Sequence, residues 1–341
     1  MSDFEFLPGF EDVWRPPVRS RAVRPRAVLG KISGSASTRA KLARVVARTP
    51  EVMVKVTGRT RDPGHLAAHL SYITRNGELP ATDRDGGDIR GAREVRDVAA
   101  DWSALAALDG RRRASTPESV SMILSMPAGT DAARLLDAVV AFAAKQFGDR
   151  HDYLLVLHTD TGHPHVHLTV RAMGDSGERL NPKKADLEAW RQEFAEQLRL
   201  RGIAAEATPR RARGITRKAE RTPVRKLRDR HEAGAGPLPE VRRFAYQEAG
   251  RAAFGGDTAP RPWETQLRTT QVRIRQTYVR EAQILRSSAD PQDRALADRV
   301  MAFVQSLPQP DSQRLALARE LRKANRGIEL AQAKPEGERS R

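Results

Sequence analysis

The chain has 341 residues, and its 60 Lys and Arg against 43 Asp and Glu give a formal net charge of +17 at pH 7. This excess predicts a polyanionic partner, because neutralised phosphates supply most sequence-independent affinity for nucleic acids. The absence of cysteine excludes thiol catalysis, zinc–thiolate sites and disulfides. No apolar run reaches the length of a membrane span and no secretory signal is visible, so we expect a soluble, cytoplasmic protein without membrane insertion.

Residues 1–49 form a basic N-terminal segment that mixes Pro-Arg and Ser-Gly stretches without sustained periodicity. Such a composition favours a mostly disordered segment, in which only residues 38–48 have the pattern of a short helix.

Residues 50–208 carry the signals of one α+β domain. Val52, Val54 and Val56 alternate with Met53 and Lys55, which predicts a strand. The whole order is strand, helix, strand, helix, strand, strand, helix, at residues 51–58, 63–77, 119–127, 130–148, 152–160, 165–173 and 184–202. This order predicts an antiparallel or mixed sheet with helices on one face, and we expect the polar residues 80–117 to be a surface excursion from it.

After residue 208 the composition becomes basic. Residues 209–230 contain ten Lys and Arg, which predicts a basic linker or a solvated helix over 209–235. Residues 236–341 are predicted to form a helical C-terminal region that ends in a disordered tail. The candidates for contacts to DNA phosphates in the basic stretch are Arg210, Arg211, Arg213, Arg217 and Lys218.

Four of the eight histidines lie in the stretch LHTDTGHPHVHLTV. His165 and His167 alternate along a predicted strand and therefore share a face, and His158 ends the preceding strand. A hairpin would bring these three imidazoles together with open positions opposite them, as a catalytic metal requires. His163 lies in the loop and is left out of the ligand set. The alternative interpretation is an exposed hairpin that merely tolerates histidine.

Imidazole ligands suit Mn, Zn, Fe or Ni, whereas Mg prefers oxygen. Asp160 is the nearest carboxylate, and we expect it to orient an imidazole or to assist proton transfer. The basic charge indicates a phosphodiester substrate, and the nucleophile is either a metal-activated water or a Ser, Thr or Tyr side chain. Tyr72 is the preferred candidate, because His69 and Arg75 would share its helix face as a base and a phosphate-binding guanidinium. A core residue at helical spacing is the alternative interpretation of Tyr72.

Three stretches, in this order along the chain, resemble the motifs of a known family. HTDTGHPHVHL closely resembles motif III of conjugative relaxases in the HUH endonuclease superfamily. The likeness is greatest to mobilisation nucleases of the MOBP type, the branch that includes the T-DNA border endonuclease. HLSYITRNG resembles motif I, in which a tyrosine attacks DNA, and MILSMPAGT resembles motif II, a strand ending in Ser-x-Pro. The resemblance covers roughly residues 51–210.

The resemblance implies a five-stranded antiparallel sheet with helices packed on it, and it assigns roles to individual residues. Tyr72 becomes the nucleophile, and Asp160 helps to activate it. Ser125 contacts DNA beside the scissile bond. His158, His165 and His167 become the ligands of a divalent metal, which in this family is Mg or Mn.

The predicted function is site- and strand-specific nicking of DNA at an origin of transfer (oriT). Attack by tyrosine would leave a 5′-phosphotyrosyl intermediate and a free 3′-OH, which initiates conjugative mobilisation. The resemblance implies single-stranded DNA, accessory relaxosome proteins and a type IV coupling protein as partners. It also implies transfer of the DNA-linked protein to a recipient cell. Alternatives are a rolling-circle replication initiator or single-strand transposase, and a non-catalytic basic nucleic-acid-binding protein.

Overall fold

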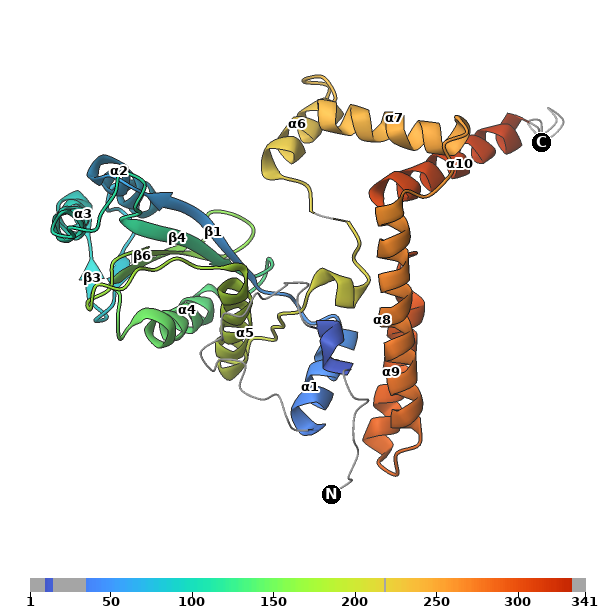
Figure 1. Ribbon diagram of the computed structural model, residues 1–341, viewed down its shortest axis with the longest axis horizontal. Coiled ribbons are helices and arrows are strands. Elements are labelled where there is room, and N and C mark those ends of the chain that lie inside the picture. Colours follow the sequence, from blue (N-terminus) through green and yellow to red (C-terminus); the bar gives the residue numbers. More distant parts are fainter. Residues whose placement is uncertain (1–9, 15–34, 218, 333–341) are drawn as a thin grey trace, which may run out of the picture. The chain divides into compact units, whose positions relative to one another are not determined.

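The computed structural model describes residues 10–14, 35–217 and 219–332. The chain forms two compact units. One comprises the described residues from 35 to 208, and the other comprises residues 10–14 and the described residues from Pro209 onward. We call them the nuclease unit, after the activity that the sequence resemblance predicts for it, and the C-terminal unit (Figure 1). Residues 1–9, 15–34 and 333–341, for most of which we expected disorder, lie outside the described residues. No helix within the described ranges is long and apolar enough to cross a membrane.

The nuclease unit is built on one antiparallel sheet of six strands in the order β1-β4-β6-β5-β2-β3. Its strands are β1 (Met53–Thr60), β2 (Ala81–Asp83), β3 (Asp88–Ile89), β4 (Ser119–Ser125), β5 (Tyr153–His158) and β6 (His165–Arg171). The antiparallel α+β class is confirmed, and the four strands with clear alternation lie where the sequence predicts them. The sheet has six strands instead of five, because β2 and β3 form a short hairpin on the far side of β5.

Helices cover both faces of this sheet, so the expectation of helices on one face is wrong (Figure 1). On one face, α4 (Ala132–Phe147) and α5 (Lys184–Leu200) bury a core with the even-numbered side chains of β4 and β6. On the other face, α2 (Pro63–Thr74) and α3 (Gly91–Ala107) pack against Leu154 and Val156 of β5. Residues 80–117 are therefore part of the core, since α3 contributes buried Val95 and Trp102.

The second of these helix layers leaves part of its sheet face uncovered. On β1, Met53 and Lys55 are exposed on the same face that α2 and α3 cover farther along. Polar side chains on the uncovered part of this sheet face are therefore accessible to solvent.

The first helix of the unit, α1 (Ser35–Val46), is tied to the end of the unit by an ion pair of 2.8 Å between Arg44 and Glu206.

The C-terminal unit consists of helices. They are α6 (Thr222–Glu232), α7 (Glu240–Phe254), α8 (Pro262–Arg286), α9 (Pro291–Ser306) and α10 (Gln313–Gln332), with the short helices η1 (Phe10–Trp14) and η2 (Arg210–Arg213). Helix α8 packs on α9, and α7 packs on α10 through small side chains such as Ala249, Ala252 and Ala318. The predicted helical C-terminal region is thus confirmed.

Tyr278 of α8 is the centre of the aromatic core in this unit. It is fully buried, it contacts Phe303 of α9 edge-on, and its hydroxyl donates to the carbonyl oxygen of Ala212 at 3.1 Å. From the other end of the chain, the indole N–H of Trp14 donates to the Tyr278 hydroxyl at 3.1 Å, and Phe10 lies edge-on to its ring. The residues just after the N-terminus therefore complete the core of the C-terminal helices.

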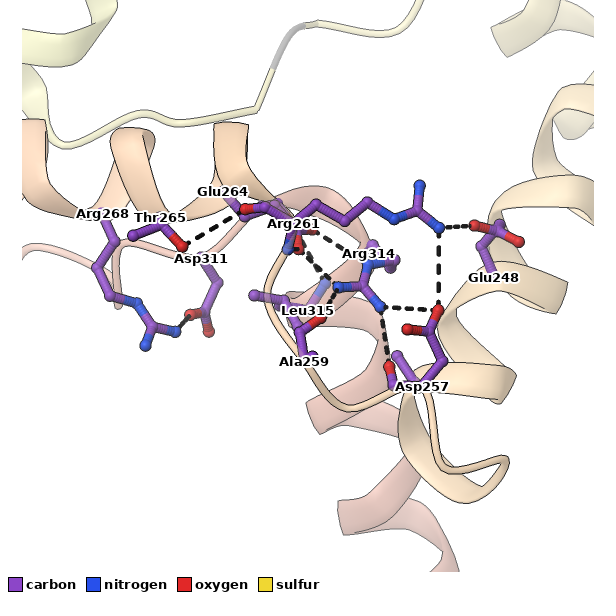
Figure 2. Close-up of polar contacts among 12 residues, drawn as sticks. Glu248, Asp257, Ala259, Arg261, Glu264, Thr265, Arg268, Asp311, Arg314 and Leu315 are labelled. Carbon is purple, nitrogen blue, oxygen red and sulfur yellow. Dashed lines mark hydrogen bonds and ion pairs between the residues drawn. The ribbon is translucent and has the colours of Figure 1, made fainter.

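A buried ion pair joins the start of α8 to the start of α10 (Figure 2). Arg314 binds both carboxylate oxygens of Glu264, at 3.2 and 2.6 Å, and also donates to the carbonyl oxygens of Asp257 and Ala259. Burial alone would raise the pKa of Glu264, but hydrogen bonds from Arg314, Ser312 and the Arg261 amide outweigh it and lower the pKa to about 2. The buried carboxylate is therefore ionised and fully bonded, the condition under which such a pair is tolerated.

Candidate active site on the sheet

The register of the sheet places the three predicted metal ligands side by side. His165 of β6 lies opposite His158 of β5 in an antiparallel pair, and His167 lies opposite Val156. Because side chains alternate along a strand, all three imidazoles emerge on the face covered by α2 and α3. The sequence prediction that the hairpin brings these three residues together agrees with this geometry.

The cluster has the dimensions of a metal site. The ring centroids of His158 and His167 are 4.5 Å apart, and each is 5.2 Å from that of His165. One nitrogen from each ring lies within 4.8 Å of the others. Three neutral imidazoles at this spacing fit a divalent transition-metal ion with further coordination positions left open for substrate.

Backbone carbonyls fix the orientation of two of these rings. Nε2 of His158 lies 2.6 Å from the carbonyl oxygen of Ile73, and Nδ1 of His165 lies 3.1 Å from that of His163. A carbonyl oxygen only accepts, so these nitrogens carry the protons, and Nδ1 of His158 and Nε2 of His165 keep their lone pairs. Such outer hydrogen bonds set the tautomer and orientation of metal ligands.

The surroundings of His167 favour its neutral form. Burial, with the neighbouring His158 and His165, lowers the pKa of His167 to about 4. His69 of α2 lies close by, where its Nε2 is 3.0 Å from the hydroxyl of Thr169, and burial lowers its pKa as well. Since His167 is uncharged at neutral pH, its lone pair is available to a cation.

Tyr72 lies in the last turn of α2, and its side chain is 75% exposed. It is therefore no core residue, which removes the alternative interpretation of its helical spacing. The next residue, Ile73, is the one whose carbonyl oxygen binds His158, so the helix that carries the phenol is tied directly to one of the three histidines.

The helix ends abruptly behind Tyr72. Arg75, Asn76 and Gly77 all have positive φ, and only glycine fits at the third position. A Cβ on Gly77 would lie 2.2 Å from the backbone of Gly91, at the start of α3. The close approach of these two segments therefore fixes where α2 stops and, with it, where Tyr72 sits.

Asp160 and Arg75 are paired with each other. The guanidinium of Arg75 lies 2.5 Å from one carboxylate oxygen of Asp160, and the other oxygen is 3.9 Å from Nδ1 of His158. Asp160 thus stands between the histidine cluster and the end of α2. Arg75, predicted to bind phosphate, has this carboxylate as its partner.

Ser125 is more enclosed than its predicted role suggests. It is 6% exposed, and its hydroxyl donates to the carbonyl oxygen of Pro164 at 3.2 Å. In the sheet it lies directly opposite His165. The hydroxyl therefore braces the segment that enters β6 and holds His165 at its position.

The predicted basic DNA contacts are unevenly exposed. Arg210 and Arg217 are exposed, but Arg210 donates to the carbonyl oxygen of Arg217, and Arg217 pairs with Glu320 at 3.5 Å. Arg211 and Arg213 are half-buried within the short helix η2. Lys218 lies outside the described residues.

Sequence reasoning missed the continuation of the histidine face toward the sheet edge. Along one row of the sheet, Met53 of β1 lies opposite Ser125, and Ser125 lies opposite His165. In the next row, Lys55 lies opposite Ile123, which is opposite His167. The alternation of β1 indicated that Met53 and Lys55 share a face, but only strand order shows that it is the histidine face.

Comparisons with known proteins find relatives of the nuclease unit. Residues 72–203 match the family model "Relaxase: MobA/VirD2-like, nuclease domain". The T-DNA border endonuclease VirD2 of Rhizobium radiobacter is 28% identical over 193 residues, which are 48% of this chain and 43% of that protein. VirD2 of Agrobacterium fabrum strain C58 is 27% identical over 248 residues, 62% of this chain and 55% of that protein. The chain thus matches about half the length of these curated relatives.

A solved structure of the MobM relaxase domain bound to 26-nucleotide pMV158 oriT DNA is also similar. It is 12% identical, covers 50% of this chain and 96% of that chain, and gives a TM-score of 0.35. The family match spans Tyr72, the histidine cluster and most of α5. Residues 72–203 of this chain are thus similar to the nuclease domain of MobA/VirD2-like relaxases.

Proposed function

We propose that this protein nicks one strand of DNA at an origin of transfer and becomes covalently attached to it through Tyr72. One observation carries the proposal. Three imidazoles lie together on one face of the sheet, and one of them, His158, is hydrogen-bonded to the Ile73 carbonyl at the end of α2. The similarity of residues 72–203 to the nuclease domain of MobA/VirD2-like relaxases supports DNA nicking as the activity.

The chemistry is a transesterification in which no water takes part. The phenolic oxygen of Tyr72 attacks the scissile phosphorus, the bond from phosphorus to the 3′ oxygen breaks, and that oxygen leaves as a 3′-OH after taking up a proton. The phosphodiester becomes a 5′-phosphotyrosyl ester, so its bond energy is conserved and the strand can be resealed. An unperturbed phenol has a pKa of about 10, so a base must take its proton.

Asp160 is the carboxylate that we assign to this proton transfer. It lies next to the cluster and pairs with Arg75, three residues after Tyr72. A phosphate that binds Arg75 would compete with Asp160 for the guanidinium and free a carboxylate oxygen beside the phenol. Ser125 would act indirectly, by holding the strand that carries His165.

His158, His165 and His167 would hold a divalent cation, for which we propose Mg²⁺ or Mn²⁺. When bound, this ion polarises a non-bridging oxygen of the scissile phosphate and stabilises charge as the new bond forms. The neutral state of His167 and the carbonyl-fixed tautomers of the other two rings support the fit.

The open half of the sheet offers a path for the single strand. Lys55 and Met53 on β1 continue the two rows that contain His167 and His165. A cation and an exposed thioether beside the catalytic cluster suit a phosphate and an unstacked base, the two features of single-stranded DNA.

A covalent-adduct assay tests the proposal. Single-stranded oligonucleotides with candidate transfer origins, labelled at the 3′ end, are incubated with the protein and Mn²⁺ or Mg²⁺ and run on a denaturing gel. We expect a protein-linked label that disappears in Tyr72→Phe and persists in Tyr246→Phe, which removes the hydroxyl of another exposed tyrosine. Cleavage that leaves no adduct, or an adduct that survives Tyr72→Phe, would overturn the assignment.

The wider role that we propose is initiation of conjugative mobilisation. In that role the protein meets accessory relaxosome proteins and a type IV coupling protein, and it enters the recipient cell attached to DNA. A mating assay with a plasmid that carries the cognate origin measures this: transfer should be lost in Tyr72→Phe and restored by the wild-type chain supplied in trans.

A further inference from the structure

The positive charge of this protein is concentrated away from the nuclease domain. Residues 50–208 contain 21 Lys and Arg against 23 Asp and Glu, whereas residues 209–341 contain 29 against 16. The region that holds the histidine cluster is thus slightly acidic, and the C-terminal region supplies most of the excess. Long-range attraction to a polyanion must therefore come largely from outside the catalytic domain.

Helix α8 separates its charges by sign. Its two acidic residues, Glu264 and Glu281, are both buried, at 2% and 0% exposure. Glu264 is neutralised by Arg314 inside the unit (Figure 2). All the charged side chains that α8 exposes to solvent are therefore arginines.

The exposed side of α8 forms a continuous strip along the helix. Its members recur at the three- and four-residue spacing of one helix face, and all are exposed: Thr265, Thr269, Arg273, Gln276, Arg280 and Gln283. We call this set the α8 strip. Part of it lines an open groove of about 420 Å³ together with Arg268 and Val272.

The two arginines of the α8 strip are available for a ligand. Outside the α8 strip but on the same helix, Arg268 pairs with Asp311 and Arg286 pairs with Asp298. Arg273 and Arg280 form no ion pair within the part of the chain that the structure describes. They stand seven residues apart, about 10 Å along the axis, with the neutral hydrogen-bonding side chain of Gln276 between them.

The chemistry of the α8 strip favours duplex DNA over a single strand. Single-stranded sites combine cations with aromatic rings on which unpaired bases stack. The α8 strip contains no aromatic residue: of the two aromatic residues of the helix, Tyr278 is fully buried, and Trp263, 52% exposed, lies outside the strip. Guanidinium, hydroxyl and amide groups along a straight rod can bind phosphates but have nothing to offer an unstacked base.

We propose that the α8 strip binds the sugar–phosphate backbone of duplex DNA without regard to sequence. The biological meaning of this proposal rests on the proposed nicking function. The two proposals together assign different parts of the DNA substrate to the two units. The C-terminal unit holds the duplex, while the nuclease unit holds the single strand that is cut.

Fluorescence anisotropy on the full-length chain tests this surface, with a labelled duplex of arbitrary sequence titrated at several salt concentrations. For Arg273→Gln/Arg280→Gln we expect duplex affinity to fall on the order of 10-fold near 0.1 M salt. The slope of log affinity against log salt should become shallower by roughly 1.8, because two phosphate contacts are lost. Adduct formation on a single-stranded oligonucleotide should not change, which separates this result from a failure of the nicking proposal.

Two further variants make the result specific. Arg243→Gln/Arg251→Gln removes the same charge from exposed arginines of α7 that pair with Glu240 and Glu248, and we expect less than a 2-fold loss. Gln276→Glu places a carboxylate in the α8 strip without removing any arginine, and should weaken duplex binding. Equal losses in the two double variants would reduce the effect to net charge and overturn the proposal. An equal loss of single-strand and duplex affinity would overturn the choice of duplex DNA.

Discussion

The two units of this protein place their polar groups in opposite ways. In the nuclease unit, an apolar core on both faces of the sheet supports histidines that remain partly accessible at the uncovered part of one face. In the C-terminal unit, the ion pair between Glu264 and Arg314 is buried inside the structure, and arginines of α8 such as Arg273 and Arg280 face solvent.

This difference separates chemistry from electrostatic attraction. A histidine cluster that must remain neutral to bind a cation is better placed in a domain with little net positive charge, because nearby cations would repel the ion. Affinity for the DNA backbone needs only exposed positive charge, and the C-terminal region supplies it. The comparison predicts that variants in one unit leave the main property of the other intact.

The largest effect should come from removing a metal ligand. We expect His167→Ala to weaken Mn²⁺ binding by on the order of 100-fold or more and to abolish adduct formation, because two imidazoles remain where three converged. His163→Ala removes an exposed histidine from the loop between β5 and β6, and this variant should bind Mn²⁺ as the wild type does. Calorimetric titration with Mn²⁺ measures both variants, and equal losses would show that the cluster is not the cation site.

Duplex affinity is the second measurement on His167→Ala. If attraction and chemistry are separate, anisotropy with duplex DNA should give the wild-type affinity for this variant. A parallel loss of duplex binding would contradict the division of tasks between the two units.

Acidification below pH 4.5 should destabilise the C-terminal unit. The folded pKa of Glu264, about 2, lies below its ordinary value of 4.5, so the stabilisation is complete above pH 4.5 and is lost as the pH falls toward 2. The full difference is about 3 kcal/mol. Glu264→Gln should lower the stability of this unit at neutral pH by an amount of that order, and should flatten its pH dependence below 4.5.

Hydrogen exchange followed by mass spectrometry resolves the two units within the whole chain. Peptides from α8 and α10 should lose protection in Glu264→Gln, while peptides from β4 and β6 keep it. Glu240→Gln removes a carboxylate that is 87% exposed and pairs with Arg243, and serves as the matched control. Equal loss of protection in both units would mean that they unfold together.

Local patterns were sufficient to predict the parts of the fold whose signals are long. Strands β1, β4, β5 and β6 lie where the sequence predicts strands, and Asp131 caps α4 by accepting from the amide of Arg134. Strand β2 has only three residues and exists because β5 offers it a partner, so no pattern in its own sequence identifies it. Helix α3 lies within the polar residues 80–117, whose composition did not indicate that a helix there covers the sheet.

The candidate site also has a part that the sequence predicts and a part that it does not. Spacing alone placed His158, His165 and His167 together, since a hairpin and strand alternation leave little freedom. The hydrogen bond from His158 to the Ile73 carbonyl joins residues 85 apart in the sequence and involves no side chain of Ile73, so no residue type signals it. The contact of Trp14 with Tyr278 joins two side chains, but these lie 264 residues apart, so no local pattern signals it.

A smaller effect should show that the N-terminal residues belong to the C-terminal unit. Trp14→Phe keeps an aromatic ring but removes the N–H that donates to the Tyr278 hydroxyl. We expect the C-terminal unit to lose about 1 kcal/mol of stability, the usual net value of one buried hydrogen bond. Trp263→Phe changes a tryptophan that is 52% exposed and should have little effect. Exchange rates in α8 peptides report the difference, and unchanged rates in Trp14→Phe would separate the N-terminal contact from the stability of this unit.

The smallest effect concerns the edge of the catalytic face. Lys55 is exposed on β1, in the sheet row that contains His167, and we expect Lys55→Gln to lower single-strand affinity only a few-fold, since one phosphate contact of several is lost. The salt slope for a single strand should become shallower by roughly 0.7. Lys184→Gln removes an exposed charge at the start of α5, on the helix layer that covers the opposite face, and should not alter that slope.

Duplex affinity should be the same in both variants, because Lys55 serves the strand that reaches the histidines and the α8 strip serves the duplex. If Lys55→Gln instead weakened duplex binding as strongly as single-strand binding, the sheet face would be one more general anion surface, and the contrast between the two units would lose its basis.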